Sequence, residues 1–299
     1  MEIKLYKLFK YIFINTIFFL NIPQLFFFIF VRFFSKDHIR VINYHDIDFY
    51  TLENFEKQIK FILKFYDNCD LKKFTLFFSS KKNNFNKPLI IFSFDDGLLS
   101  HYKFVLPILN KYKLTGWFFI PTNFINTNAS KINLINNYNG DVSSIINQKI
   151  ITSKVRHFMN WDEIRNIISQ NHIIGSHSHN HVRLVDELPQ SYIDDQIILS
   201  KNIIEAKTNQ KINFFCWVGG EEYSYGKKTY DTIKLNYKYA FSTNYKTIKK
   251  YTDKLLIDRT NIETSYLWSF FIFYFSGLID FLYIFKRLRL RKKMTSKLK

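Results

Sequence analysis

The chain has 299 residues, which is enough for one large α/β domain or two small ones. Its formal net charge is +18, and residues 286–299 contain eight lysines and arginines without a single acidic residue. Cys69 and Cys216 are the only cysteines, and their number and spacing exclude a disulfide framework and a zinc-ribbon type of thiolate site.

The chain begins with an apolar segment. Tyr11–Val31 comprises 21 mostly apolar residues between flanking lysines and arginines, and a segment of this length can cross a bilayer core of roughly 30 Å. No small-residue cleavage pattern follows it, so we do not expect a cleaved signal peptide. The alternative is a pair of interfacial or core helices broken at Pro23. We define 1–36 as an apolar N-terminal segment and a candidate membrane anchor.

Strand-like and helix-like patterns alternate from residue 37 to residue 265. Short apolar runs predict buried strands at Arg40–Tyr44, Pro88–Phe94, Thr115–Ile120, His172–Gly175 and Asn213–Val218. Longer patterns predict helices at Val105–Tyr112, Trp161–Gln170 and Gln190–Thr208. Asn126–Lys149, rich in Asn and Ser, interrupts the alternation as an insertion or loop. The alternation predicts βα units and a mostly parallel sheet or barrel.

Two adjacent carboxylates follow the predicted strand Pro88–Phe94. Asp95 and Asp96 come directly after its apolar residues, and Gly97 provides a turn. In βα proteins, the carboxyl ends of strands are where sites are built. One carboxylate can bind a metal ion while its neighbour acts as a base. The alternative is an aspartate-rich turn that caps the next helix.

A histidine cluster follows the predicted strand His172–Gly175. Three of the eight histidines, His177, His179 and His181, lie within five positions. His177 and His181 are four residues apart, and a helical turn would place both imidazoles on one face. Two histidines and one carboxylate leave open positions on a divalent ion, which is typical of catalytic sites. A histidine cluster without a metal is the alternative.

The chain ends with a second apolar run and a basic tail. Leu267–Phe285 is interrupted by Gly277 and Asp280, and the basic residues of 286–299 follow directly. Lysine and arginine next to a membrane segment tend to stay cytoplasmic. If both apolar runs span, the domain between them lies on the periplasmic or extracellular side. If neither spans, both lie flat on an anionic leaflet. We expect membrane association through the termini, and define 266–299 as an apolar helix with a basic tail.

The two motifs together resemble a known enzyme family. FSFDDG, followed about eighty residues later by GSHSHNH, is similar to the two first motifs of the polysaccharide deacetylases (carbohydrate esterase family 4, the NodB-homology domain). YHDI at 44–47, LENFEKQIKFI at 52–62, FVLPILNKYKLTGWFFIPTNFI at 104–125 and NWDEI at 160–164 add to the resemblance, which covers roughly residues 38–263. It implies a distorted (β/α) barrel of the NodB-homology type, here with apolar N- and C-terminal helices.

The resemblance also implies roles for individual residues. Asp96, His177 and His181 would bind one divalent metal ion, for which zinc is our expectation and cobalt, nickel and iron are alternatives. Asp95 would be the general base that takes a proton from the attacking water. Ser178 would hold the loop between the two histidines.

The chain departs from the usual family pattern in its later motifs. It has no histidine after His181 to serve as the acid of a late Leu-x-x-His motif, and FCWVGG at 215–220 replaces the usual Arg-x-x-Pro-Tyr. Tyr44-His45 instead matches an early Tyr-His motif of the poly-N-acetylglucosamine deacetylase branch. We therefore expect His45 to be the general acid. The alternative is a histidine that only packs within the barrel.

Three further residues are candidates for binding substrate or orienting the base. Arg259 in DRTNIE resembles a late Arg-x-Asn segment of the family and would orient Asp95 or bind substrate; a surface salt bridge is the alternative. Trp217 and Tyr223 are candidates for stacking on sugar rings, although packing is the default for aromatic residues in a chain that is 19% aromatic.

The resulting expectation is a metal-dependent hydrolase in the domain 37–265. It would remove N-acetyl groups from N-acetylhexosamine units of a surface polysaccharide or a lipid-linked glycan and release acetate. The alternative is a catalytically silent glycan-binding or assembly protein on the same scaffold. Nucleic-acid binding through the basic tail lacks any motif, and we do not expect it.

Overall fold

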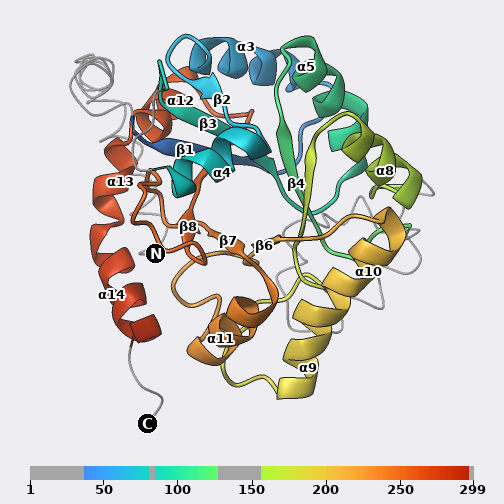
Figure 1. Ribbon diagram of the computed structural model, residues 1–299. Helices are drawn as coiled ribbons and strands as arrows, with labels where there is room; N and C mark the ends of the chain where they lie inside the picture. Colours follow the sequence, from blue (N-terminus) through green and yellow to red (C-terminus); the bar gives the residue numbers. More distant parts are fainter. Residues whose placement is uncertain (1–36, 81–84, 127–155, 296–299) are drawn as a thin grey trace, which may run out of the picture.

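The computed structural model describes residues 37–80, 85–126 and 156–295. The N-terminal segment 1–36 and nearly all of the insertion expected at Asn126–Lys149 lie outside the described residues. Within them, helices surround a parallel sheet (Figure 1). The strands are β1 (Ile39–Tyr44), β2 (Asp67–Asn68), β3 (Leu89–Phe94), β4 (Gly116–Ile120), β5 (Ile173–Ser176), β6 (Phe214–Cys216), β7 (Tyr239–Ser242), β8 (Ile257–Asp258) and β9 (Thr260–Asn261).

The sheet is nearly closed into a barrel. Its strands follow the order β8-β7-β6-β5-β4-β3-β1-β9, with β2 paired to β3, and every pair is parallel. The strands at the two ends of this order, β8 and β9, are joined in the chain by the single residue Arg259. The chain therefore bridges the two edges of the sheet at Arg259, which confirms the distorted (β/α) barrel.

The helices lie around the sheet. They are α3 (Leu52–Ile62), α4 (Leu71–Ser79), α5 (Leu106–Lys111), α8 (Trp161–Ser169), α9 (Gln190–Asp194), α10 (Ser200–Thr208), α11 (Lys227–Asn236), α12 (Trp268–Phe275), α13 (Leu278–Leu282) and α14 (Ile284–Thr295). The helix α4 also contributes Phe74 and Phe77 to the interior cluster described below. A π-helical turn at His101–Val105 precedes α5, and another at Asp195–Leu199 joins α9 to α10. The pattern at Gln190–Thr208 is thus an unbroken helical stretch, as the sequence predicts, with a π turn at its centre.

Successive side chains of the strands point alternately into two hydrophobic cores, one outside the barrel and one inside it. Ile42, Phe92 and other residues of one phase pack against the surrounding helices, whereas Val41 and Ile91, of the opposite phase, belong to a second cluster with Phe74 and Phe77 of α4. Side chains alternate between the faces of a strand, so this second cluster fills the barrel interior. The same phase continues to Asn43, Ser93 and Asp95. The interior is therefore apolar toward the amino ends of the strands and polar at their carboxyl ends.

The predicted strands and helices are confirmed to within one to four residues at their ends. The sequence patterns did not predict the strands β2, β7, β8 and β9 or the helices α3, α4 and α11. The strands β2, β8 and β9 have only two residues each, too few to show a period of two. Their structure depends on pairing with longer neighbours.

The C-terminal apolar run folds against the barrel. Gly277, with φ of +87°, separates α12 from α13, and Phe271 and Phe275 of α12 are buried against Phe61 of α3. The buried guanidinium of Arg40 on β1 binds Asp280 of α13 at 2.9 Å. Within the described residues, no helix combines the length and the hydropathy needed to cross a bilayer.

Candidate active site

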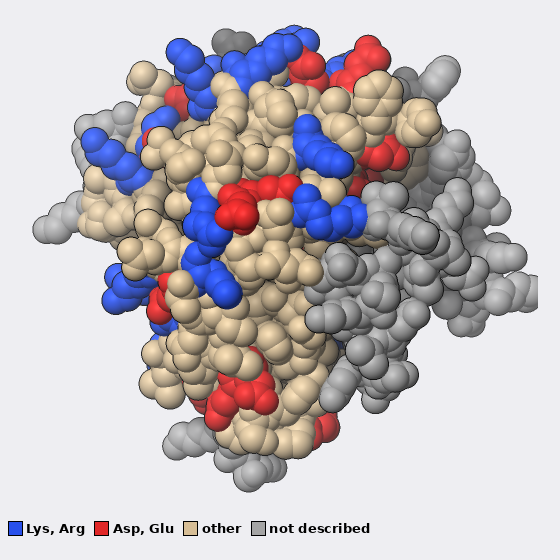
Figure 2. Space-filling view, turned by 90° about the vertical axis from the view of Figure 1, so that its right-hand side faces the viewer, with Lys and Arg blue, Asp and Glu red and all other residues tan. Residues whose placement is uncertain are grey.

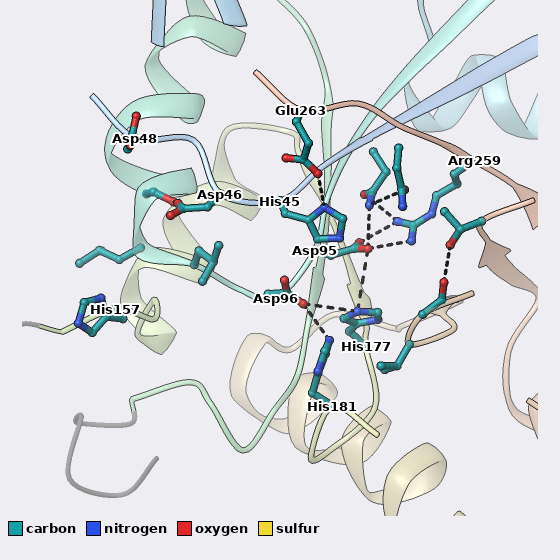
Figure 3. A pocket seen from close by; sticks show the side chains of 18 of the residues that line it. His45, Asp46, Asp48, Asp95, Asp96, His157, His177, His181, Arg259 and Glu263 are labelled. Carbon is teal, nitrogen blue, oxygen red and sulfur yellow. Dashed lines mark hydrogen bonds and ion pairs between the residues drawn. The ribbon is translucent and has the colours of Figure 1, made fainter. Parts of the chain in front are cut away.

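The candidate site lies in a cavity at the carboxyl ends of the strands. The cavity has a volume of about 640 Å³ and is lined by Asp95, Asp96, His177 and His181 together with His45 and Arg259 (Figure 3). His45 follows β1, the two aspartates follow β3, and His177 follows β5. The parallel sheet thus brings residues from four distant parts of the sequence to one edge, where βα proteins commonly carry their catalytic groups.

Asp95 is held by a buried arginine. Arg259 donates from Nη1 to Oδ1 at 2.7 Å and from Nη2 to Oδ2 at 2.8 Å, and Asn43 donates to Oδ2 at 3.1 Å. Both members of the ion pair are at most 3% exposed. Burial alone would raise the pKa of Asp95, but the charges of Arg259 and neighbouring groups lower it well below its usual range. Asp95 is therefore ionised and fixed in orientation at neutral pH. Arg259 is not a surface salt bridge.

Asp96 points in a different direction from Asp95. It has a φ of +77°, and Gly97 follows with +64°, so the chain turns sharply as it leaves β3. A Cβ atom on Gly97 would lie 3.0 Å from the side chain of Ile125, and together with the positive φ this explains the glycine. The turn directs the Asp96 carboxylate toward the two histidines, with Oδ1 at 3.6 Å from Nε2 of His177 and 3.0 Å from Nε2 of His181.

The two histidines converge through a loop rather than the helical turn that their spacing predicted. Ser178 and His181 have φ of +67° and +55°, values that a right-handed helix excludes. The loop still brings the two rings to a centroid distance of 4.9 Å. Ser178 Oγ accepts a hydrogen bond from the backbone N–H of Val182 at 3.3 Å. This contact agrees with the expected role of Ser178 in holding the loop.

Asp96, His177 and His181 fit a divalent metal ion. Their ligand atoms lie within 4.8 Å of one another, and all three side chains are buried. Neither Asp96 oxygen accepts a hydrogen bond from any described residue, and Nδ1 of His181 likewise lacks a hydrogen-bond partner there. Buried carboxylate oxygens are costly without donors or a cation. Two imidazoles and a carboxylate are the donor set that zinc and similar ions prefer.

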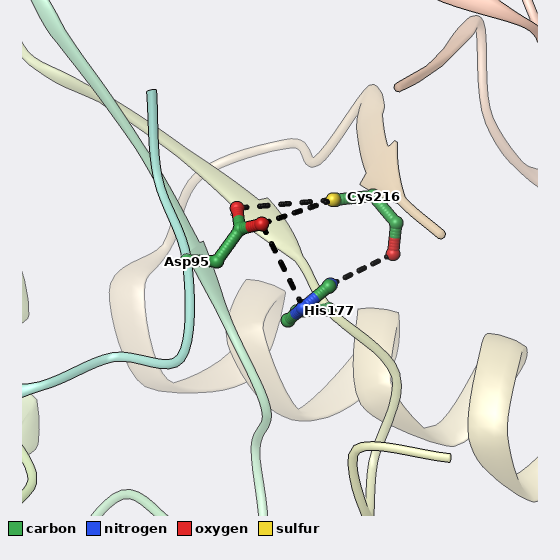
Figure 4. A group of neighbouring side chains, drawn as sticks. All are labelled: Asp95, His177 and Cys216. Carbon is green, nitrogen blue, oxygen red and sulfur yellow. Dashed lines mark hydrogen bonds and ion pairs between the residues drawn. The ribbon is translucent and has the colours of Figure 1, made fainter. Parts of the chain in front are cut away.

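The carbonyl of Cys216 orients His177. Nδ1 of His177 lies 2.9 Å from this oxygen (Figure 4). Burial lowers the pKa of His177 to about 4, so the ring is neutral at pH 7. In a neutral ring Nδ1 carries the proton that it donates to the carbonyl, and Nε2 keeps its lone pair toward Asp96.

The Cys216 thiol belongs to the surroundings of Asp95. Sγ lies 3.8 Å from both Asp95 oxygens. Asp95, His177 and Cys216 form a second group with the spacing of metal ligands. Burial raises the pKa of the thiol well above its usual value, however. The thiol therefore suits a weak donor to Asp95, and Asp96 with the two histidines fits a metal ion better than this second group does.

His45 stands at the opening of the cavity with its own carboxylate partner. Its side chain is 37% exposed, and Nδ1 lies 3.3 Å from Oε1 of Glu263. Partial desolvation at the cavity wall lowers the pKa of His45, but the bond to Glu263 and the charges of Asp96 and Asp95 outweigh it and raise the pKa to about 9. His45 is therefore a protonated imidazole at neutral pH. Nε2 of His101 lies 2.7 Å from the backbone oxygen of His45, and this contact fixes the backbone of His45.

The aromatic candidates differ in accessibility. Trp217 is fully buried, stacks on Tyr225 at a centroid distance of 4.4 Å and donates to the Leu255 carbonyl at 3.0 Å. It is therefore part of the core, and the prediction that it stacks on a sugar ring is wrong. Tyr223 is exposed, and the Arg183 guanidinium lies 5.6 Å from its ring. Tyr223 does not line the cavity, whereas Arg183 does.

Asn43, Cys216 and Glu263 were not predicted from the sequence. Asn43 and Cys216 contact Asp95, and Glu263 contacts His45. Asn43 occupies the same phase of β1 as Val41, and this period of two could have identified it as an interior polar residue. Glu263 stands in DRTNIE, four residues after Arg259.

Comparisons with known proteins agree with this geometry. Residues 82–240 match the family model described as polysaccharide deacetylase, a range that contains both aspartates and both histidines but neither His45 nor Arg259. No curated protein matches the chain.

Solved structures are similar in fold. Streptococcus pyogenes deacetylase PplD, solved in complex with acetate, is 16% identical with a TM-score of 0.58, over 77% of this chain and 95% of that one. IcaB from Ammonifex degensii is 15% identical with a TM-score of 0.58, over 82% and 97% of the two chains. The BpsB deacetylase domain from Bordetella bronchiseptica is 16% identical with a TM-score of 0.59, over 77% and 97%. At these identities the likeness shows the fold alone.

The family model spans more than half of the chain, and the barrel carries the paired aspartates and histidines at one cavity. The chain is therefore an enzyme that belongs to the polysaccharide deacetylase family.

Proposed function

We propose that the protein is a metal-dependent deacetylase that hydrolyses the acetamido group of N-acetylhexosamine units in a glycan and releases acetate. The observation that carries the proposal is the buried Asp96 carboxylate, which lacks hydrogen-bond donors among the described residues and faces Nε2 of both His177 and His181. Such an arrangement is costly in a protein without a cation and favourable with one.

The metal site consists of Asp96, His177 and His181. A divalent ion bound there would supply positive charge that polarises the acetyl carbonyl and increases the acidity of water. The residues around it keep its ligands in place, because His177 donates through Nδ1 to the Cys216 carbonyl. We expect zinc, and cobalt, nickel and iron suit the same donor set.

Asp95 is the general base in this proposal. Its pKa is low, so it is ionised at neutral pH, and Arg259 and Asn43 fix the plane of its carboxylate. An ionised carboxylate beside the metal site accepts the proton of the attacking water as the carbon–oxygen bond forms. Arg259 acts through Asp95 and is a positioning residue.

His45 is the general acid. Its protonated ring can donate to the nitrogen of the departing sugar amine as the carbon–nitrogen bond breaks, and Glu263 keeps the ring protonated. A single positioned acid of this kind typically contributes ~10²–10⁴-fold to the rate. The base and the acid thus reach the cavity from β3 and β1, which are adjacent strands.

A surface polysaccharide or a lipid-linked glycan is the substrate class that we propose. The test measures acetate release from N-acetylglucosamine oligomers and from lipid-linked N-acetylhexosamine, with and without a chelator. It addresses both the substrate class and the metal dependence. We expect chelator-sensitive release that returns when zinc is added back. A protein that binds zinc but releases acetate from neither substrate would overturn the proposed substrate class, and release unaffected by chelation would overturn the metal.

A further inference from the structure

The C-terminal helices carry a stripe of exposed apolar side chains. Leu282 of α13 is 57% exposed, and Phe285 and Leu288 of α14 are 73% and 55% exposed. These residues follow one another at intervals of three, which places them on one side of a helical path. Ile284, also exposed, lies next to them. Large apolar side chains exposed in a row are uncommon on a soluble surface and indicate an interaction site.

The opposite side of α14 is attached to the domain. Leu290 is buried, and Arg287 donates to the backbone oxygens of Asn244 and Tyr245, at 2.9 and 2.6 Å, and of Asp280 at 2.7 Å. In Figure 1, α13 and α14 run along one flank of the barrel. These contacts set the rotation of the helix, so the apolar stripe faces away from the protein.

The charge around the stripe is strongly positive. Residues 286–299 contain eight basic and no acidic residues, and Lys286 and Arg289 lie beside Glu221 and Glu222 of the neighbouring loop. The segment itself thus contributes only positive charge. By contrast, basic and acidic side chains are interspersed on the face that carries α8 and α10 (Figure 2).

We propose that α13 and α14 dock on an anionic lipid bilayer, with Leu282, Phe285 and Leu288 in the interface and the positive charge of this segment attracting the headgroups. A helix that combines an apolar stripe with lysines and arginines is suited to lie in the plane of such a surface. A second copy of the chain fits less well, because two equally basic helices would repel each other.

Docking in this orientation would place the catalytic cavity beside the bilayer. Gly219 lines the cavity, and the next residues along this loop, Glu221 and Glu222, form the ion pairs with Lys286 and Arg289 of α14. One wall of the cavity is thus a direct neighbour of the proposed membrane-binding helix. A glycan held close to a membrane would then be within reach of the catalytic residues. This last point rests on the proposed function, whereas lipid binding itself does not.

The test uses the full chain with an environment-sensitive fluorophore on a single introduced cysteine. Phe285→Cys and Leu288→Cys report on the stripe, and Leu235→Cys, at an 86% exposed position of α11, is the matched control. The native Cys69 and Cys216 are buried and unreactive by comparison. Each labelled protein is mixed with phosphatidylcholine vesicles that contain or lack phosphatidylglycerol, and bound protein is quantified by sedimentation.

We expect the labels at 285 and 288 to shift to the blue and brighten about two-fold or more with phosphatidylglycerol vesicles, as apolar burial requires. The label at 235 should not respond, and added salt should weaken the effect because it screens the headgroup charge. Protein that sediments with these vesicles while the labels at 285 and 288 stay in water would overturn the proposal. A concentration-dependent blue shift without vesicles would also overturn it, in favour of self-association. Fluorescence and sedimentation report lipid binding without catalysis. A failure of the membrane proposal can therefore be distinguished from a failure of the deacetylase proposal.

Discussion

Arg259 binds both carboxylate oxygens of Asp95 through parallel hydrogen bonds of 2.7 and 2.8 Å, in the buried interior of the barrel. Arg259 is the one residue between β8 and β9, which lie at opposite ends of the sheet order, and Asp95 directly follows β3. The ion pair therefore connects the closure of the barrel to the carboxylate that we propose as the general base. Its loss should affect both stability and activity.

Replacing Arg259 by methionine should lower the free energy of unfolding at pH 7 by about 3 kcal/mol, because Asp95 would remain as an uncompensated buried charge. Urea unfolding measures this effect. The control is Arg165→Met, which removes an exposed ion pair with Asp162 and should cost at most about 1 kcal/mol. Equal losses for the two variants would contradict the structural role of Arg259.

The same comparison has a defined pH dependence. Arg259 lowers the pKa of Asp95, so the stabilisation from the ion pair is present above the unfolded pKa of roughly 3.9 and is lost as the pH falls below it. The difference between the wild type and Arg259→Met should therefore shrink on acidification. A difference that grows toward acid pH would contradict this coupling.

His45→Ala should reduce the rate of glycan deacetylation by ~10²–10⁴-fold if His45 protonates the departing amine. Hydrolysis of an aryl acetate releases a phenolate, a weakly basic leaving group that needs no proton. The rate of this reaction should therefore be nearly unchanged in the same variant. The rates of both substrates, measured side by side, separate an acid from a structural residue. Equal loss on both substrates would contradict the assignment, and His157→Ala, at another histidine of the cavity wall, is the control.

Glu263→Gln should move the alkaline limb of the rate profile to lower pH. Glu263 is among the groups that raise the pKa of His45 to about 9, and a neutral glutamine no longer favours the protonated ring. An acid is active below its pKa, so the rate should begin to fall at a lower pH in the variant. The dependence of kcat on pH measures the shift. If the alkaline limb does not move, a group other than His45 causes it, and the assignment of His45 as the acid is contradicted.

Asp96→Asn and His181→Ala should each weaken zinc binding by about a hundred-fold or more, because each removes one of three protein ligands. Equilibrium dialysis measures the affinity directly. A ligand that binds the folded state also raises the thermal midpoint, so zinc should stabilise the wild type and not these variants. His179→Ala is the matched control, since His179 bonds to Thr122 rather than to the cluster. Unchanged affinity in Asp96→Asn would place the metal elsewhere.

The sequence alone was sufficient to predict the positions of site residues that lie in short contiguous motifs. The strand before Asp95 and Asp96 is six apolar or small residues long, enough to show where it ends. The clustering of His177 and His181 was equally informative about their convergence. Their local conformation was not, because spacing of four is also compatible with a loop in which Ser178 and His181 have positive φ.

Contacts between distant segments could not be predicted in the same way. The bond between His45 and Glu263 joins residues 218 positions apart, and it exists because β9 pairs with β1. From the sequence, Trp217 is only a candidate for stacking on a sugar ring, with packing as the default, and its position next to β6 directs it into the core against Tyr225. Which face of a strand end is buried depends on the whole barrel.

The most direct test of the account is acetate release from N-acetylglucosamine oligomers by zinc-loaded wild type and by Asp95→Asn, with equal folding and zinc content confirmed for both proteins. The account predicts steady release by the wild type and a loss of ~10²-fold or more in Asp95→Asn, because the amide cannot accept the proton of the attacking water. Release at wild-type rate by Asp95→Asn would contradict the assignment of this site as the deacetylase centre.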